Sequence, residues 1–408
     1  MDENELRKRP SAEWIAELRA RYPVERTVDL TLTKKLERRA SGAALPADLG
    51  DIKKRIDAFL GKKIQGAFEI RDLTTLTGGA SKEQFSFRLD WTCNGEQRRG
   101  ERMVLRREPS ESVVETNRLR EFQLIAAAEK IVPVPKAYWL DETGEELGRP
   151  AMIYGFVDGV QKPTNGTSNV TGVGIQFNAS QRSVIAPQFI GYLSKIHRFD
   201  PGTANLSAFD MPRVGTTDDV DWQLNWWTRV WREDMFEAIP LLALAEQWLR
   251  ANRQPLDHLS MVHSDYRTGN YLFDGDTLQI TAILDWELGY FGDRHHDLAW
   301  ILMPSFETPA EDGRRLSSSL FMRDEFIAAY EQASGLKVSL ERLRYYTIFV
   351  LWKGSIMTLG TALRAAHGAK SHQDVVLTWF AGLGYTLMES LRRELVEVMS
   401  PGKSSARN

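Results

Sequence analysis

The sequence predicts an α+β protein of two lobes, a small antiparallel sheet with one main helix followed by a large, mostly helical lobe. Between about residues 65 and 160, short runs indicate strand, strand, strand, helix, strand and strand, in that order. After residue 181, apolar residues recur every three to four positions, as in amphipathic helices. We therefore expect a helical N-terminal extension over 1–50, a sheet lobe over 51–157 and a helical lobe over 158–408.

Composition limits the possible partners. The 408 residues are 42% hydrophobic and 26% charged with a net charge of −3, which is ordinary globular composition and gives no general affinity for nucleic acid or an anionic membrane. The start, MDENELRKRPSAEW, lacks the apolar core of a signal peptide, and no apolar run approaches the ~20 residues that span a bilayer. The single cysteine, Cys93, lies in the alternating run FSFRLDWTC and is interpreted as structural. We expect a cytoplasmic protein.

The extension is charged and helix-prone, ends in the loose segment ASGAALPADLG, and is expected to pack on the outside of the main body. After it, DIKKRIDAFLGK spaces Ile52, Ile56 and Leu60 four apart, which predicts a short amphipathic helix.

The sheet lobe begins with FEIRDLTTLTGGASKEQFSFRLDW, a strand, a Gly-rich turn and a strand, and continues with the strand RRGERMVLRRE. SVVETNRLREFQLIAAAEK predicts a helix opened by Ser112, with Glu115 three residues later completing a capping box. IVPVPKAYWLD is extended because of its prolines, and RPAMIYGFVDG is a buried strand that leads into a connector at about 154–159.

The helical lobe opens with a polar, Gly-rich loop over 160–181, whose length is typical of a functional or disordered segment. Trp222, Trp226 and Val230 then mark one helix, and Pro240 begins the next.

Two short strands interrupt the helices in MVHSDYRTGNYLFDGDTLQITAILDWELGYFGDRHHDLAW, residues 261–300. The pattern is His263-x-Asp265-x-x-x-x-Asn270, with Asp285 at the end of the apolar strand ITAIL. Gly292-Asp293 and Asp297-Leu298-Ala299 follow. The order of these parts makes a chance match improbable, although the first motif alone is short.

This set resembles the catalytic and metal-binding loops of the protein-kinase-like phosphotransferases, closest to the aminoglycoside and choline kinase branch. The resemblance implies a bilobal protein-kinase-like fold and transfer of the terminal phosphate of a nucleotide, ATP or GTP, to an alcohol. Such a reaction needs a carboxylate to orient or deprotonate the hydroxyl and oxygen ligands for Mg²⁺. Asp265 is the expected base, and Asn270 and Asp285 are the expected metal ligands.

Neighbouring residues receive weaker assignments. The resemblance implies that His263 packs under the catalytic turn and that Asp297 hydrogen-bonds its backbone. Arg267 lies where protein kinases carry a Lys that contacts the transferred phosphate, so it is either a catalytic group or a surface charge. His295 and His296 are adjacent and point apart, which makes a shared metal improbable.

The sheet lobe supplies the expected nucleotide site. Gly78, Gly79 and Ser81 form a Gly-rich turn similar to the GGxSN loop of this branch. Arg106, in VLRR, stands where protein kinases have Lys, and it remains charged and can contact two oxygens. Glu121 shares a helix face with apolar residues, so it is either the partner of Arg106 or an exposed residue paired with Arg118.

The connector residues Tyr154 and Phe156 are expected to offer backbone groups to the nucleotide base. Over about residues 65–390 the motifs GGxS, VLRR, VPVPK, GFVDG and HSDYRTGN resemble the kinase-like domains fused to some acyl-CoA dehydrogenases. Members of that group are often called aminoglycoside phosphotransferases, and some act on hydroxyacyl thioesters.

Three functions remain open. An aminoglycoside phosphotransferase would need carboxylates beside Asp265, for which the run Asp218-Asp219-Val220-Asp221 is a candidate, although helix N-termini attract Asp anyway. A kinase of an apolar or acyl-thioester alcohol is favoured by the aromatic surface of DWQLNWWTRVW, unless Trp222, Trp226, Trp227 and Trp231 are core. An inactive nucleotide-binding module is the third. We prefer a small hydroxylated metabolite, and the sequence does not indicate the oligomeric state.

Overall fold

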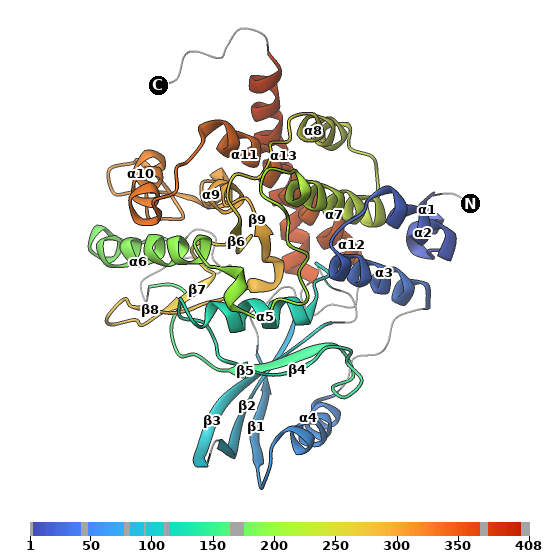
Figure 1. Cartoon of the computed structure of the whole chain (residues 1–408), viewed down its shortest axis with the longest axis vertical. Helices are drawn as coiled ribbons and strands as arrows, with labels where there is room; N and C mark the ends of the chain where they lie inside the picture. The colour runs from blue at the N-terminus through green and yellow to red at the C-terminus, as the bar shows by residue number, and fades with distance from the viewer. Residues whose placement is uncertain are drawn as a thin grey trace.

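The protein is described by a computed structural model that covers residues 3–41, 48–76, 82–93, 95–109, 112, 114–163, 175–367 and 374–400. The predicted α+β fold of two lobes is confirmed: a sheet lobe lies at one end and helices fill the other (Figure 1). Among the described residues, no helix has the length and apolar character needed to cross a membrane.

The sheet lobe contains one five-stranded antiparallel sheet. Its strands are β1 (Glu69–Thr75), β2 (Glu83–Cys93), β3 (Glu96–Arg107), β4 (Ala137–Asp141) and β5 (Ala151–Gly155). They lie in the order β1-β2-β3-β5-β4, so the central β3 pairs with both β2 and β5. Because strand side chains alternate between faces, Val104 and Arg106 of β3 face the helical lobe, whereas Leu105 joins the opposite core.

Two helices flank this sheet. On the far side, α4 (Leu49–Lys63) contributes Ile52, Ile56 and Leu60 to the core it shares with the sheet, as its four-residue spacing predicted. On the inner side, α5 (Arg118–Ala128) lies between the sheet and the helical lobe (Figure 1). Leu124 and Ile125 of α5 belong to the main core of the helical lobe, so α5 connects the two lobes.

The predicted start of α5 was wrong. The helix begins at Arg118, and its N-cap is Asn117, whose side chain accepts a hydrogen bond from the backbone N–H of Arg120. Ser112 does not cap it; its hydroxyl contacts Lys82 and Glu108. The hydrogen bonds of Ser112 to Lys82 and Glu108 therefore replace the capping interaction that the local sequence pattern predicted.

The helical lobe is built from helices of very different length, from 5 residues in α12 to 26 in α13. They are α6 (Ala179–His197), α7 (Asp218–Asp234), α8 (Pro240–Ala251), α9 (His295–Ile301), α10 (Arg323–Ser334), α11 (Leu340–Ile356), α12 (Leu363–His367) and α13 (Asp374–Met399). A π-helical turn, η4 (Met357–Ala362), joins α11 to α12, and 3-10 turns lie at η1 (Pro201–Thr203), η2 (Trp286–Leu288) and η3 (Pro304–Phe306). As predicted, Pro240 is the first residue of its helix.

Short hairpin-like strands carry the motif. β6 (Ser260–Val262) pairs with β9 (Tyr290–Gly292), and β7 (Tyr271–Phe273) pairs with β8 (Ile280–Ile283). A further pair, β10 (Glu307–Pro309) and β11 (Arg315–Ser317), follows α9. The first two pairs bring residues far apart in the motif to one edge of the helical lobe.

The extension consists of α1 (Glu3–Lys8), α2 (Ala12–Arg21) and α3 (Arg26–Ser41), which lie beside α7 in Figure 1. Lys35 of α3 donates to Glu233 and Asp234 at the end of α7. Just before α3, Glu25 forms an ion pair with Arg120 of α5, with the closest nitrogen and oxygen 2.6 Å apart. The extension therefore contacts both the helical lobe and the helix that links the lobes.

Candidate active site

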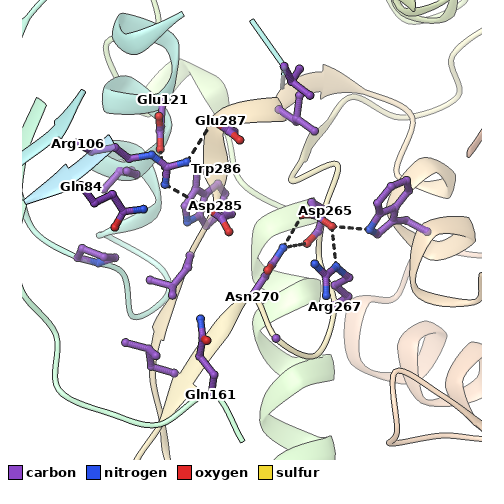
Figure 2. A pocket seen from close by; sticks show the side chains of 18 of the residues that line it. Gln84, Arg106, Glu121, Gln161, Asp265, Arg267, Asn270, Asp285, Trp286 and Glu287 are labelled. Atoms are coloured by element: carbon purple, nitrogen blue, oxygen red, sulfur yellow. Dashed lines mark hydrogen bonds and ion pairs between the residues drawn. The ribbon is translucent and has the colours of Figure 1, made fainter. Parts of the chain in front are cut away.

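A cavity of about 480 Å³ lies between the sheet and the helical lobe. Its lining comes from β3 and α5 on one side and from the motif segments, α9, η4 and α13 on the other. The charged lining residues are Arg106, Glu121, Asp265, Arg267, Asp285 and Glu287. Figure 2 shows two groups among them, one around Arg106 and one around Asp265.

Asp265 is held by side chains that donate to both of its carboxylate oxygens. Oδ1 accepts from Trp300 Nε1 at 2.7 Å and from Arg267 Nε at 3.0 Å. Oδ2 accepts from Asn270 Nδ2 at 2.6 Å. The side chain is 21% exposed, so its direction is fixed while part of it faces the cavity.

The loop that carries Asp265 is anchored from below. Asp297 accepts hydrogen bonds from the backbone N–H groups of His263 and Ser264 at 2.8 and 2.7 Å, as the resemblance implied. His263 Nε2 donates to the carbonyl of Leu284 at 2.9 Å, and its Nδ1 accepts from the N–H of Asp265. Burial lowers the pKa of His263, which keeps the ring in the neutral form that this pattern requires.

A backbone hydrogen bond between adjacent segments brings Asn270 close to Asp285. The backbone N–H of Leu284 donates to the carbonyl of Asn270 at 2.8 Å, so Asp285 follows directly after a residue bonded to Asn270. Asp285 adopts a left-handed backbone with φ of 59°, which is rare outside Gly, Asn and Asp, and its side chain is 42% exposed. Among the described contacts, Asn270 uses only its Nδ2 nitrogen, which leaves the amide oxygen as a possible ligand.

Arg106 lies among three carboxylates (Figure 2). Its Nη1 is 3.0 Å from Asp285 Oδ1 and 3.4 Å from Glu121 Oε1. Its Nη2 is 3.1 Å from Glu287 Oε2, and these contacts hold the pKa of Arg106 well above its usual value despite burial. Glu121 contacts Arg106, as the first alternative expected. It also pairs with Arg118, as the second expected, but it is buried and not exposed.

Sequence reasoning gave Glu287 no role and missed Lys82 and Glu108. Glu287 contacts Arg106, Arg118 and Lys82. Lys82 Nζ, fully buried, donates to Glu108 at 2.9 Å. Burial by itself would raise the pKa of Glu108, but the charges of Arg118 and Lys82 lower it overall. Lys82 directly follows the Gly-rich turn in the sequence, and this position could have marked it as a residue of the site.

Other predicted residues have different outcomes. Arg267 is not a simple surface charge, because its guanidinium bends back to Asp265 and lies 5.0 Å from the ring centre of Phe306. Tyr154 and Phe156 line the cavity, but the N–H of Phe156 donates to Arg102 and is not free for a base. Gly78, Gly79 and Ser81 lie outside the described residues.

The half of the cavity on the helical-lobe side of Asp265 is mostly apolar, although Ser305 and Thr358 also line it. It is lined by Trp300, Met303, Phe306, Met357, Leu383 and Leu387. Met357 belongs to the π-helical turn η4, a form that often occurs at functional sites. This surface was not predicted from the sequence, since its residues come from four separate segments.

Both acceptor surfaces suggested by the sequence lie elsewhere. Trp226, Trp227 and Trp231 are core residues, and no Trp of α7 lines the cavity. The acidic run at the start of α7 does not line it either: Asp219 Oδ2 accepts from the backbone N–H of Asp293, and Asp221 pairs with Arg253.

Residues 72–346 match the model of the phosphotransferase enzyme family. The chain belongs to this family. The match runs from within β1 to the first part of α11 and includes both motif hairpins, whereas the cavity-lining residues of η4 and α13 lie beyond it.

The relatives with similar sequences are longer proteins. The chain is 27% identical over 262 residues to acyl-CoA dehydrogenase family member 10 of Mus musculus, covering 63% of this chain and 22% of the relative. It is 23% identical over 367 residues to family member 11 of Homo sapiens, covering 86% and 44%. The chain thus spans less than half the length of these relatives.

Solved structures share the fold at low identity. A Ralstonia eutropha JMP134 protein described as an aminoglycoside phosphotransferase aligns with a TM-score of 0.56 and 20% identity, over 83% of this chain and 98% of its own. A thermostable mutant of the aminoglycoside phosphotransferase APH(4)-Ia, in complex with AMP-PNP and hygromycin B, aligns with a TM-score of 0.53 and 16% identity, over 84% and 98%.

Proposed function

We propose that this phosphotransferase family member transfers the terminal phosphate of a magnesium-bound nucleotide, ATP or GTP, to a hydroxyl of a small molecule with an extended apolar part, such as a hydroxyacyl thioester. The observation that carries the proposal is the position of Asp265. It lines one cavity together with the charged residues around Arg106 and with an apolar surface that includes Met357 and Leu387.

Each side chain has a role in this proposal. Asp265, fixed by Asn270 and Trp300, would orient the acceptor hydroxyl and take its proton as the oxygen bonds to the terminal phosphorus. The bond from that phosphorus to the bridging oxygen breaks, and the nucleoside diphosphate leaves. Arg106 would face the nucleotide phosphates while it keeps Glu121 and Glu287 paired. Arg267, beside Asp265, would stabilise charge on the transferred phosphate.

The chain has donors that fit Mg²⁺. This ion prefers oxygen ligands and usually takes few from the protein. The half-exposed carboxylate of Asp285 and the amide oxygen of Asn270 belong to adjacent backbone segments and would hold it. Bound there, the ion would neutralise negative charge on the phosphates. Among the described residues, no group of three or more His, Cys, Asp or Glu side chains forms another metal site.

The lining favours an apolar acceptor over an aminoglycoside. A polycationic antibiotic needs several carboxylates near the attacked hydroxyl. Among the described lining residues, the only carboxylates besides Asp265 are Glu121, Asp285 and Glu287, and all three contact Arg106. An acyl chain, in contrast, would be buried against the apolar half of the cavity.

An acceptor panel tests this choice. Purified chain with Mg-ATP or Mg-GTP is given hydroxyacyl-CoA thioesters of increasing chain length, hygromycin B and choline, and nucleoside diphosphate release is measured together with the mass of the product. We expect turnover of the thioesters, with kcat/KM rising by up to about fourfold per buried methylene, the equivalent of about 0.8 kcal/mol. Turnover of hygromycin B alone would show that the acceptor assignment is wrong.

The Asp265→Asn variant separates catalysis from binding. It should lower kcat by about 10²- to 10⁴-fold while leaving nucleotide affinity within a few fold, because a carboxamide keeps the shape but cannot accept the proton. Asp221→Asn, an exchange of the same type outside the cavity, is the control and should keep full turnover. Nucleotide binding by the wild-type chain without turnover of any acceptor would favour an inactive module.

A further inference from the structure

Lys353 of α11 is a fully buried lysine next to the catalytic loop. Its Nζ donates to Ser264 Oγ at 2.6 Å and to the Ser264 carbonyl at 3.2 Å. Lys353 does not line the cavity, although the next residue, Gly354, does. A buried ammonium group is costly unless its partners compensate it, so its position next to this loop calls for an explanation.

The residue that Lys353 holds has an unusual backbone. Ser264 directly precedes Asp265 and adopts φ of 70°, the left-handed region that costs a non-glycine residue of order 1–3 kcal/mol. Asp297 accepts from its N–H, and Lys353 donates to its carbonyl and hydroxyl. Every polar group of Ser264 is thus held by a buried charge, and the direction of Asp265 follows from that conformation.

A second contact connects Lys353 with Asp265. The ammonium lies 4.9 Å from the ring centre of Trp300, whose Nε1 donates to Asp265 Oδ1. It also lies 5.3 Å from the ring centre of Trp227, so the ammonium contacts the faces of two aromatic rings.

The surrounding carboxylates offset part of the cost of burying Lys353. Burial lowers the pKa of Lys353 to about 7, while the carboxylates of Asp265 and Asp297 oppose that fall. His296 Nε2 lies 3.3 Å from Nζ, and burial, with the nearby Lys353 charge, lowers the pKa of His296 well below its usual value. His296 is therefore a neutral neighbour that does not repel the ammonium.

We propose that Lys353 is a positioning residue for phosphoryl transfer, which holds the strained Ser264 backbone and the Trp300 ring so that Asp265 points into the cavity. The inference rests on the proposed function and adds to it a residue outside the motif. It predicts an effect on the chemical step rather than on nucleotide binding, since Lys353 has no access to the cavity.

The test compares Lys353→Met with Lys35→Met, which removes a second buried lysine far from the loop. With Mg-ATP and the best acceptor of the panel, Lys353→Met should lower kcat by about 10- to 100-fold and change the nucleotide KM less than threefold. Lys35→Met should keep the wild-type kcat per folded molecule. Ser264→Ala, which removes only one acceptor atom of Lys353, should lower kcat by about three- to tenfold and serves if Lys353→Met fails to fold.

A double-mutant cycle excludes a general structural role. If Lys353 acts through Asp265, adding Lys353→Met to Asp265→Asn should change the single-turnover rate less than twofold. Multiplicative losses in the cycle, or a wild-type kcat in both Lys353→Met and Ser264→Ala, would overturn the inference. Absence of phosphoryl transfer by the wild-type chain would instead overturn the proposed function itself, so the two failures are distinguishable.

Discussion

Two networks of buried charged side chains in this molecule are similar in composition but differ in what they face. We call the first the cleft network; it consists of Lys82, Arg106, Arg118, Glu108, Glu121, Asp285 and Glu287. We call the second the extension network; it consists of Lys35, Arg39, Arg229, Arg364, Asp29, Glu233 and Asp234.

The difference lies in the balance of charge and in access to the cavity. Among the described residues, three cations face four carboxylates in the cleft network, and Asp285 remains 42% exposed at the cavity. In the extension network four cations face three carboxylates, and the more exposed Arg19 adds a fifth cation on Asp29. The side chains of Glu233 and Asp234 are 0% and 2% exposed. Buried charge alone therefore does not identify a functional site. In the cleft network, however, the carboxylate of Asp285 lines the cavity, and the proposed nucleotide site lies there.

The largest expected effect is on Arg106, which links the cleft network to the cavity. Arg106→Met should lower kcat/KM by about 10²- to 10³-fold, because the charge that faces the phosphates is lost. Glu121 and Glu287 keep Arg118 as a partner, so the fold should survive. Steady-state kinetics with Mg-ATP measures the change.

Arg107 is the matched control for that experiment. It is the next residue on β3, equally buried, and it pairs with Glu83 away from the cavity. Arg107→Met should lower the melting temperature but leave turnover per folded molecule unchanged. If both variants lose activity equally, or if Arg106→Met keeps wild-type kinetics, the cleft network has no special role.

The comparison also shows what the sequence could predict. Asp265, Asn270 and Asp285 were expected in one crevice, and they do lie at one cavity because a short hairpin fixes their separation. Their roles remain predictions. The succession of strands and one helix along the sheet lobe, and the helix α4, were equally predictable, since each depends on local periodicity.

Long-range packing determined what local patterns did not. Ser112 and Glu115 have the spacing of a capping box, yet Lys82, thirty positions away, takes Ser112 as a partner. Trp226 lies on an amphipathic stripe, but periodicity cannot say whether such a stripe faces a cavity or the core. No sequence motif marks Lys353, because its proposed role depends on contact with a loop 89 positions earlier.

In the extension network, Lys35 should affect stability and not catalysis. Lys35→Met leaves Glu233 and Asp234 buried with one cation fewer, which should lower the free energy of unfolding by about 3 kcal/mol. Chemical denaturation measures this loss, and the kcat per folded molecule should stay within twofold. Lys34→Met, at an exposed neighbouring position, should change stability by less than about 0.5 kcal/mol. A parallel loss of kcat would mean that the extension also controls the active site.

The smallest expected effect is the pH dependence of the same network. Burial by itself would raise the pKa of Asp234, but Lys35, Arg39 and Arg364 outweigh it and hold that pKa at about 2, below the usual 3.8. The stabilisation that Asp234 provides is therefore complete above about pH 4 and is lost as the pH falls through 2, an amount of about 2 kcal/mol. The difference in unfolding free energy between wild type and Asp234→Asn should accordingly shrink from pH 5 to pH 2, whereas that of the exposed Asp276→Asn should stay flat. A constant difference for Asp234→Asn would show that its carboxylate is not stabilised by these cations. The contrast between the extension network, whose acidic groups are paired with surplus cations, and the cleft network would then lose its electrostatic basis.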